Sequence, residues 1–170
     1  MSKYLIAIIP PEPVAGDIYR LKEYFRDKYN SKASLNSPAH ITMHMPFEFD
    51  ERRENELFEA LPLKEELSIE LDGFNVFAPR VIFIDVKPNP ALTRSQKELI
   101  QFCKTRLNVF NADYKDQPFH AHVTLAFRDL KKDVFTTAWE EFKSKSYHAR
   151  FECNRLSLLK HDGKFWREFS

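Results

Sequence analysis

The sequence has few cysteines and no long apolar run. It contains only two cysteines in 170 residues, and neither Cys103 nor Cys153 belongs to a C-x-x-C pair, which argues against a zinc knuckle or a redox dithiol. Both lie in apolar-patterned segments, so we expect buried free thiols. The apolar run near the N-terminus, Tyr4–Ile9, is too short for a signal peptide or a membrane span. These features predict a soluble, cytoplasmic protein that does not act at a membrane.

The chain also lacks a strong charge of either sign. Its 26 basic and 25 acidic residues give a net charge of only +1, so there is no basic footprint for long tracts of nucleic acid. A local basic patch and a small phosphate-bearing substrate are compatible with this balance. A hydrophobic content of 43%, with 16 phenylalanines, is enough for a substantial core, and the length suits one compact domain.

A four-residue motif occurs twice. Residues 40–43 read His-Ile-Thr-Met, and residues 122–125 read His-Val-Thr-Leu. Alternate side chains of a β-strand share a face. Each copy should therefore place its histidine and threonine on one face and bury its two apolar residues on the other. Continued alternation places His44 on the face of the first histidine, and Ala126 and Arg128 on the face of the second.

Patterning elsewhere predicts the neighbouring elements. Apolar residues at helical spacing indicate a helix over Val14–Tyr29, and the apolar phase changes at Gly73, which indicates a bulge. Phe151–Lys160 has the pattern of one strand. The pair Asp162-Gly163 is typical of a type I′ hairpin turn.

The two halves of the chain share one order of elements. Each half follows the order strand, helix, loop, motif strand, helix, strand, so we expect pseudo-repeats over about 1–78 and 79–170 within a single domain. The predicted class is α+β. Two antiparallel-rich sheets flanked by helices would form two lobes, and the polar faces of the motif strands would meet across a central cleft, bordered by the loop 108–119.

Two imidazoles that face each other can act as a pair, one as the general base and the other as the general acid. Imidazole titrates near pH 6.5, so one ring can take a proton from an attacking oxygen while the other gives one to the leaving oxygen. Each step typically contributes about 10²–10⁴-fold. Thr42 and Thr124 would hold the phosphate oxygens, and Arg128 could add a charge-assisted bond. These side chains require no metal or other cofactor, and symmetry leaves open which of His40 and His122 is the base.

The doubled motif resembles that of the two-histidine phosphoesterase superfamily, in particular its 2′-5′ RNA ligase-like and cyclic phosphodiesterase branches. The resemblance covers essentially the whole chain and includes residues 71–77 and 80–84. It implies a bilobal α+β fold and action on an RNA end, an oligonucleotide or a cyclic nucleotide, by a protein that we expect to be a monomer. The motif residues that carry over are His40, Thr42, His122 and Thr124. His44 and His120 are outside the family's motif.

Two other functions stay open. A cleft of this kind could bind a nucleotide without turnover, as a binding module. Alternatively, His120 and His122 could converge with His40 and His44 on a zinc ion, as in a metallohydrolase. Threonine is a poor zinc ligand, and no carboxylate shares the motif faces. We therefore favour the metal-free enzyme.

Overall fold

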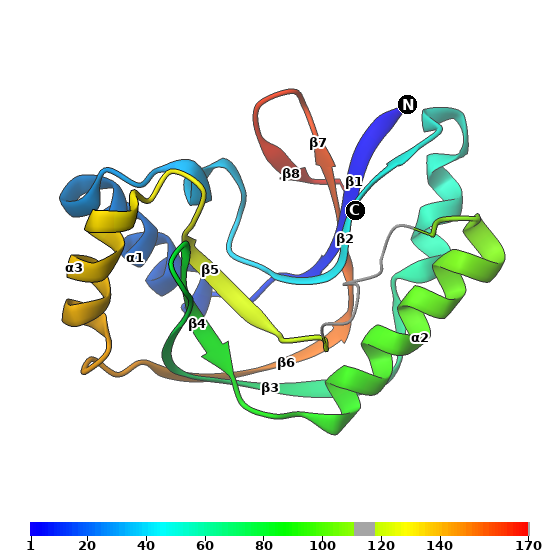
Figure 1. The fold of residues 1–170 in the computed structure, drawn as a ribbon. Helices are drawn as coiled ribbons and strands as arrows, with labels where there is room; N and C mark the ends of the chain where they lie inside the picture. Colours follow the sequence, from blue (N-terminus) through cyan, green and yellow to red (C-terminus); the bar gives the residue numbers. More distant parts are fainter. Residues whose placement is uncertain (111–117, 170) are drawn as a thin grey trace.

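The computed structural model describes residues 1–110 and 118–169. Within these ranges two four-stranded antiparallel sheets form the body of the protein (Figure 1). The first sheet has the order β2-β1-β7-β8, with β1 at Ser2–Ile8, β2 at Ile41–Phe49, β7 at Ser157–His161 and β8 at Trp166–Glu168. The second has the order β5-β4-β3-β6, with β3 at Pro62–Phe77, β4 at Val81–Val86, β5 at His122–Ala126 and β6 at His148–Arg155. The predicted α+β class with two antiparallel sheets is confirmed.

Helices flank the sheets at both ends of the molecule. The α-helices are α1 at Val14–Tyr29, α2 at Pro90–Leu107 and α3 at Lys132–Phe142, and the 3₁₀ helices are η1 at Ala33–Asn36 and η2 at Glu51–Ala60. α1 and α3 lie at one end, and α2 lies at the other (Figure 1). The predicted helix over Val14–Tyr29 is confirmed. In the described part of the chain, no helix is both long and apolar enough to cross a membrane.

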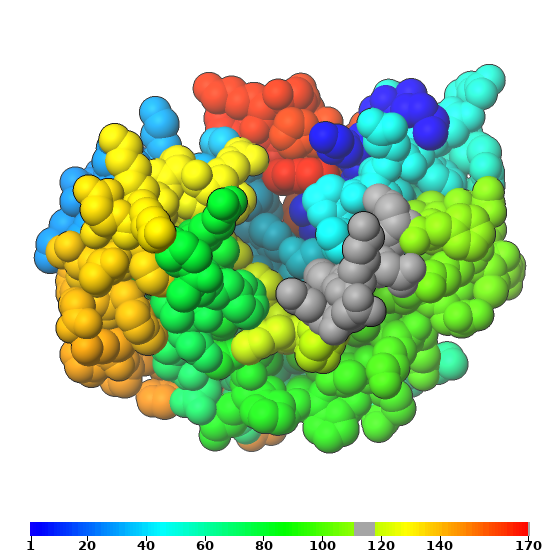
Figure 2. Space-filling model, in the orientation of Figure 1, coloured from blue at the N-terminus to red at the C-terminus, as the bar shows by residue number. Residues whose placement is uncertain are grey.

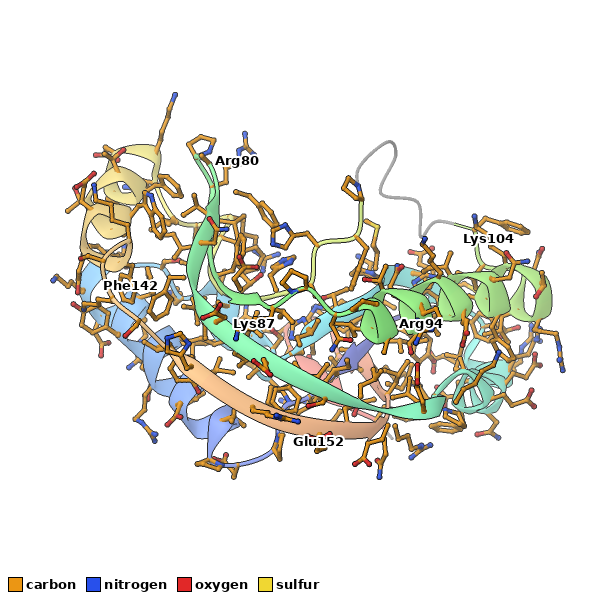
Figure 3. All side chains as sticks on the ribbon, turned by 90° about the horizontal axis from the view of Figure 1, so that it is seen from below. Arg80, Lys87, Arg94, Lys104, Phe142 and Glu152 are labelled. Carbon is orange, nitrogen blue, oxygen red and sulfur yellow. The ribbon has the colours of Figure 1, made fainter. Side chains whose placement is uncertain are left out.

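One buried cluster joins the two sheets. It includes Tyr4 and Ile6 of β1 and Ile84 of β4, all fully buried. The ring of Phe142, labelled in Figure 3, stacks on that of Phe25 with centroids 4.7 Å apart, which fixes α3 against α1. Apolar burial of this kind is the dominant favourable term in folding. The two cysteines are buried and free, as predicted, and burial raises the pKa of the Cys103 thiol to about 12.

The bulge predicted at Gly73 is confirmed, but two other predictions are corrected. At Gly73 the pairing of β3 with β4 slips, and φ is +77°. The strand predicted over Phe151–Lys160 is two strands, because the chain leaves one sheet and enters the other at Leu156, which donates its N–H to the Leu61 carbonyl. Alternation alone cannot show that a strand changes partners.

The predicted hairpin exists, but its turn begins one residue later. His161 of β7 pairs with Trp166 of β8, and the backbone N–H of Asp162 donates to the Phe165 carbonyl, so the turn is centred on Gly163 and Lys164. It is not a type I′ turn, because φ is positive at Gly163 but not at Lys164. The carboxylate of Asp162 accepts hydrogen bonds from the backbone N–H groups of Lys164 and Phe165, which favours this position of the turn.

The sheets do not divide the chain at its middle. β3 ends before the predicted boundary near residue 78, yet it pairs with β4 and β6, which both follow that boundary. The boundary between pseudo-repeats near residue 78 therefore stays a prediction. Of the predicted loop 108–119, residues 111–117 lie outside the described residues.

Candidate active site

Both motif strands are edge strands. β2 is the edge of one sheet and β5 is the edge of the other, and the two strands contact each other. A cavity of about 660 Å³ opens where they meet. In Figure 2 the surface is hollowed beneath the C-terminal segment, drawn in red. The cavity lining includes His40, Thr42, Thr124 and Arg128. Four of the five residues predicted from the sequence are thus brought together.

His122, the fifth predicted residue, adjoins this cavity without being part of its lining. It lies two residues before Thr124 on β5, and its charge acts on His40, whose pKa it helps to lower. The rings of Phe77 and Phe83 both pack against the His122 ring, with centroids 5.0 Å away in each case. These two aromatic rings hold the imidazole in place beside the cavity.

The two motif imidazoles make the same hydrogen bond. Nδ1 of His40 lies 2.7 Å from the Pro38 carbonyl oxygen, and Nδ1 of His122 lies 2.7 Å from the His120 carbonyl oxygen. A carbonyl can only accept, so Nδ1 carries the hydrogen in both rings. This leaves each Nε2 without a hydrogen bond to a described residue. Each ring is therefore oriented so that Nε2 can exchange a proton with a substrate.

Alternation fails in β2 directly after the threonine. Ala7 of β1 pairs with Thr42, but Ile6 pairs with His44, so Met43 is an extra residue in the strand. A bulge of this kind re-aims the side chains that follow it. His44 consequently points into the core and is fully buried, not on the face of His40. The predicted position of His44 on the cleft face is wrong.

β5 has a bulge at the corresponding position. Phe83 of β4 pairs with Thr124, but Ile82 pairs with Ala126, so Leu125 is extra. Ala126 is fully buried in the core, and its predicted place on the cleft face is also wrong. Arg128 does reach the cavity, but from the turn that follows the strand and not by alternation.

Burial and neighbouring charges favour the neutral form of both rings. Burial, together with the positive charge of Lys22 and the charge of His122, lowers the pKa of His40 to about 4. Burial and the charge of His120 lower the pKa of His122, while the negative charge of Asp85 opposes that change. The two rings are therefore alike in hydrogen bonding but different in the charges around them.

The cavity is cationic. Its charged lining residues are Lys3, Arg128 and Lys164, with His161 and His40 as further ionisable groups. None of the described residues that line it is an aspartate or a glutamate. Such a cavity favours an anionic ligand. The net charge of the whole chain does not indicate this local excess of positive charge.

A second cavity of about 610 Å³ is lined by His120 and by residues at the start of α2. Two of its basic residues are already paired, since Lys87 lies 3.1 Å from Glu70 and Arg94 lies 2.9 Å from Glu65. Lys87 and Arg94 are labelled in Figure 3 near the start of α2. A third basic residue, Lys97, also lines the second cavity, but so does Asp85, whereas no described lining residue of the motif cavity is acidic.

Several residues around the site were missed by sequence reasoning. Lys22 is only 2% exposed and donates from Nζ to the carbonyls of Ser34 (2.8 Å) and Ser37 (3.0 Å). A signal was present, because Lys22 follows Ile18 by four residues and therefore interrupts the buried stripe of α1 with a charge. Asp129 is another residue missed, and nothing in its local sequence marks it.

The imidazoles do not form the four-histidine site that the metallohydrolase alternative requires. His44 is turned into the core, and Nε2 of His120 lies 2.9 Å from Oδ1 of Asp85. Among the described residues there is no group of three or more histidine, cysteine, aspartate or glutamate side chains that could hold a metal ion.

Comparison with known proteins agrees with the fold and the doubled motif. The family model of the 2′-5′ RNA ligase superfamily matches residues 10–165. The chain belongs to the 2′-5′ RNA ligase superfamily. A superfamily relative from Geobacillus kaustophilus, provisionally named a phosphoesterase, is 28% identical over 163 residues, covering 92% of this chain and 87% of that protein. A relative from Geobacillus sp. strain WCH70 with the same provisional name is 25% identical over 163 residues, with the same coverage of both chains.

Solved structures share the superfamily fold. The protein TT0787 of Thermus thermophilus superimposes with a TM-score of 0.64 at 17% identity, covering 99% of this chain and 95% of that one. Escherichia coli LigT in complex with 3′-AMP gives a TM-score of 0.64 at 15% identity, with the same coverage. At such low identity these similarities establish the architecture of this superfamily member and not its substrate.

Proposed function

We propose that the protein is a metal-independent phosphoesterase that acts on a 2′,3′-cyclic phosphate or a 2′-5′ linkage, in RNA or in a nucleotide. His40 and His122 serve as the acid–base pair, and Thr42 and Thr124 bind the phosphate. One observation carries the proposal. Two imidazoles, each with its Nδ1 hydrogen held by a carbonyl and its Nε2 unengaged, adjoin a cavity whose charged lining residues are all basic.

The reaction on a cyclic phosphate needs one proton removed and one supplied. One Nε2 takes a proton from water as the water oxygen bonds to phosphorus. The bond from phosphorus to one ribose oxygen breaks, and the other Nε2 donates its proton to that oxygen. The product is a phosphomonoester, and the two rings have exchanged protonation states, which solvent restores. If a hydroxyl of a second chain attacks phosphorus in place of water, the same two proton transfers join two ends.

Charge stabilisation in the cavity comes from fixed donors. The hydroxyls of Thr42 and Thr124 reach the same cavity from opposite strands, and each can donate to a non-bridging phosphate oxygen. Arg128 adds a guanidinium to that lining, suited to a charge-assisted bond with the phosphate. Placed in advance, these donors cost no reorganisation as charge develops on the phosphate oxygens.

The relatives support a nucleotide as the ligand. LigT has been crystallised with 3′-AMP, ATP, NADP⁺ and phosphate, all of which carry phosphate groups. The relatives from Geobacillus are provisionally named phosphoesterases. A ribonucleotide phosphate is therefore the substrate class that we propose for this chain.

A panel of substrates tests the proposal. Wild-type protein is incubated in chelator with 2′,3′-cyclic mononucleotides, 2′-5′ oligonucleotides and RNA ending in a cyclic phosphate. We expect turnover of at least one of them. The rate of this turnover should fall by about 10²-fold or more in His40→Ala and in His122→Ala. His148→Ala, on the outer strand β6, is the matched control and should keep full activity. Full activity of His122→Ala, or activity that chelator removes and zinc restores, would contradict the mechanism.

The binding module is the alternative. If the cleft only binds, calorimetry would detect a mononucleotide while no product appears with any member of the panel. The paired, unengaged Nε2 atoms favour turnover, because a site that only binds phosphate has no need of two proton carriers.

A further inference from the structure

The charged groups behind the two histidines differ in sign. On the side of His40, the ammonium group of Lys22 is buried in α1 and held by the carbonyls of Ser34 and Ser37. Burial lowers the pKa of Lys22 to about 8, which still leaves the amine mostly charged at pH 7. A positive charge is therefore fixed behind the first motif.

Lys22 is linked to His40 through a short stretch of backbone. Its Nζ binds the carbonyl of Ser37, and the next residue, Pro38, supplies the carbonyl that receives Nδ1–H of His40. The amine thus both fixes the turn that orients the ring and opposes its protonation, since like charges repel. Ser34 also binds β5, because its hydroxyl donates to the Leu125 carbonyl at 2.7 Å.

The other basic groups that line the cavity have the same sign of charge as Lys22. Lys3 of β1, Arg128 from the turn after β5, and Lys164 of the β7–β8 turn all line the cavity with His40, as does His161 of β7. Each of these groups, when charged, disfavours a proton on the His40 ring.

A carboxylate stands beside His122. Asp85 of β4 is the residue paired directly with His122 across the sheet. Its carboxylate is fixed by Nδ2 of Asn75 at 3.1 Å and by Nε2 of His120 at 2.9 Å. A negative charge at this position favours a proton on His122, whereas His120 opposes it when charged. His40 has no carboxylate among the described residues that line its cavity.

We propose that this difference assigns the roles of the two histidines: His40 is the general base, and His122 holds the proton and is the general acid. Lys22 and Asp85 are positioning residues that set this direction. The assignment rests on the proposed function for its catalytic meaning. In an empty cleft both rings are neutral at pH 7. When an anionic phosphate binds, it attracts one proton, and that proton goes to His122.

The assignment fixes the orientation of the substrate. The attacking water lies on the β2 side, where its proton passes to Nε2 of His40 as the oxygen bonds to phosphorus. The leaving ribose oxygen lies on the β5 side, where it takes the proton from Nε2 of His122 as its bond to phosphorus breaks. The nucleoside that carries this oxygen therefore lies toward β5.

Titration of the imidazoles by NMR tests the order of protonation without any turnover. The protein is titrated with and without inorganic phosphate, and the signals are assigned with His40→Gln and His122→Gln. We expect His122 to take up its proton at a higher pH than His40 in both conditions, with the larger upward shift on phosphate binding at His122. The opposite order would overturn the assignment.

The two positioning residues are tested by the pH dependence of kcat/KM. Lys22→Met should move the acidic limb to higher pH, by of the order of one unit, because the base is no longer opposed by a cation. Lys22→Arg keeps the charge and should leave the limb in place. Lys28→Met, on the same helix but paired with Glu141, is the matched control.

Asp85→Asn is best made together with His120→Gln, because His120 also acts on His122. Relative to His120→Gln alone, the double variant should move the alkaline limb to lower pH. Asp72→Asn removes a similar contact, 2.9 Å from Nδ1 of His148, and should leave both limbs in place. If either positioning variant fails to fold, the order in which the two imidazoles take up protons in the wild-type protein, measured by NMR, still tests the assignment. Turnover together with the opposite order of protonation would refute only the assignment of acid and base. The expected order of protonation without any turnover would refute only the proposed function.

Discussion

Oδ1 of Asp129 lies 2.7 Å from the hydroxyl oxygen of Ser31. The other carboxylate oxygen accepts hydrogen bonds from the backbone N–H groups of Lys32 and Ala33, each at 2.9 Å. Asp129 follows β5, and residues 31–33 precede β2, so this carboxylate ties together the surroundings of the two motifs. We expect Asp129→Ala to lower the free energy of unfolding by about 2–3 kcal/mol, because it leaves the buried hydroxyl of Ser31 unpaired.

Urea denaturation followed by circular dichroism measures this effect. Asp133→Ala, in the exposed first turn of α3, is the control and should change the free energy of unfolding by less than about 0.5 kcal/mol. Activity of Asp129→Ala should fall as well, because the turn that orients His40 is no longer held. Equal stability of the two variants would show that the Asp129 contacts do not support the fold.

The sequence predicted what local periodicity determines and missed what tertiary contacts determine. A strand period of two places a histidine and the threonine two residues later on one face, and this held for both motifs. It failed at His44 and Ala126, since a bulge depends on the pairing with a neighbouring strand. The contacts of Asp129 could not be predicted for the same reason. Its partners lie almost a hundred positions away, and no local pattern marks them.

The hydroxyl of Thr124 should matter for catalysis through its hydrogen. Thr124→Val keeps the shape but removes the donor, so we expect kcat/KM to fall by roughly 10- to 100-fold. Thr124→Ser restores the hydroxyl and should recover most of that loss. Steady-state kinetics on the best substrate of the panel decides the matter. Thr137→Val, on the exposed face of α3, serves as the control, and equal kinetics of the Val and Ser variants at Thr124 would rule out a role for the hydroxyl.

Arg128 should contribute to phosphate binding from the turn after β5. Its guanidinium lies 5.1 Å from the centroid of the Phe127 ring, a contact that restrains the side chain at the cavity. We expect Arg128→Ala to lower kcat/KM by roughly 10- to 100-fold, with a smaller loss for Arg128→Lys, because lysine keeps the charge without the planar fork. Arg150→Ala, on the outer strand β6, is the control and should behave like the wild type. An unchanged kcat/KM in Arg128→Ala would remove this residue from the site.

His44 should make the fold sensitive to mild acid. Its ring is fully buried against Phe47, with centroids 4.8 Å apart, and Nε2 has no hydrogen-bond partner among the described residues. Burial lowers the pKa of His44 in the folded protein, whereas the unfolded chain keeps a value near 6.5. Above that pH both states are neutral at this residue. As the pH falls below about 6.5, the unfolded chain takes up the proton first, and stability is lost.

Replacement by an aromatic ring of similar shape isolates this effect. His44→Phe removes the titrating group, so the free energy of unfolding should fall less between pH 7.5 and pH 5.5 than in the wild type, by up to about 1.4 kcal/mol for each pH unit below 6.5. His40 and His122 also have lowered pKa values. Their contribution is present in both proteins and cancels in the comparison. Tyr19→Phe, at an exposed position, removes no imidazole and should keep the wild-type slope. Parallel slopes for His44→Phe and the wild type would show that His44 takes up its proton equally well in the folded and unfolded chains.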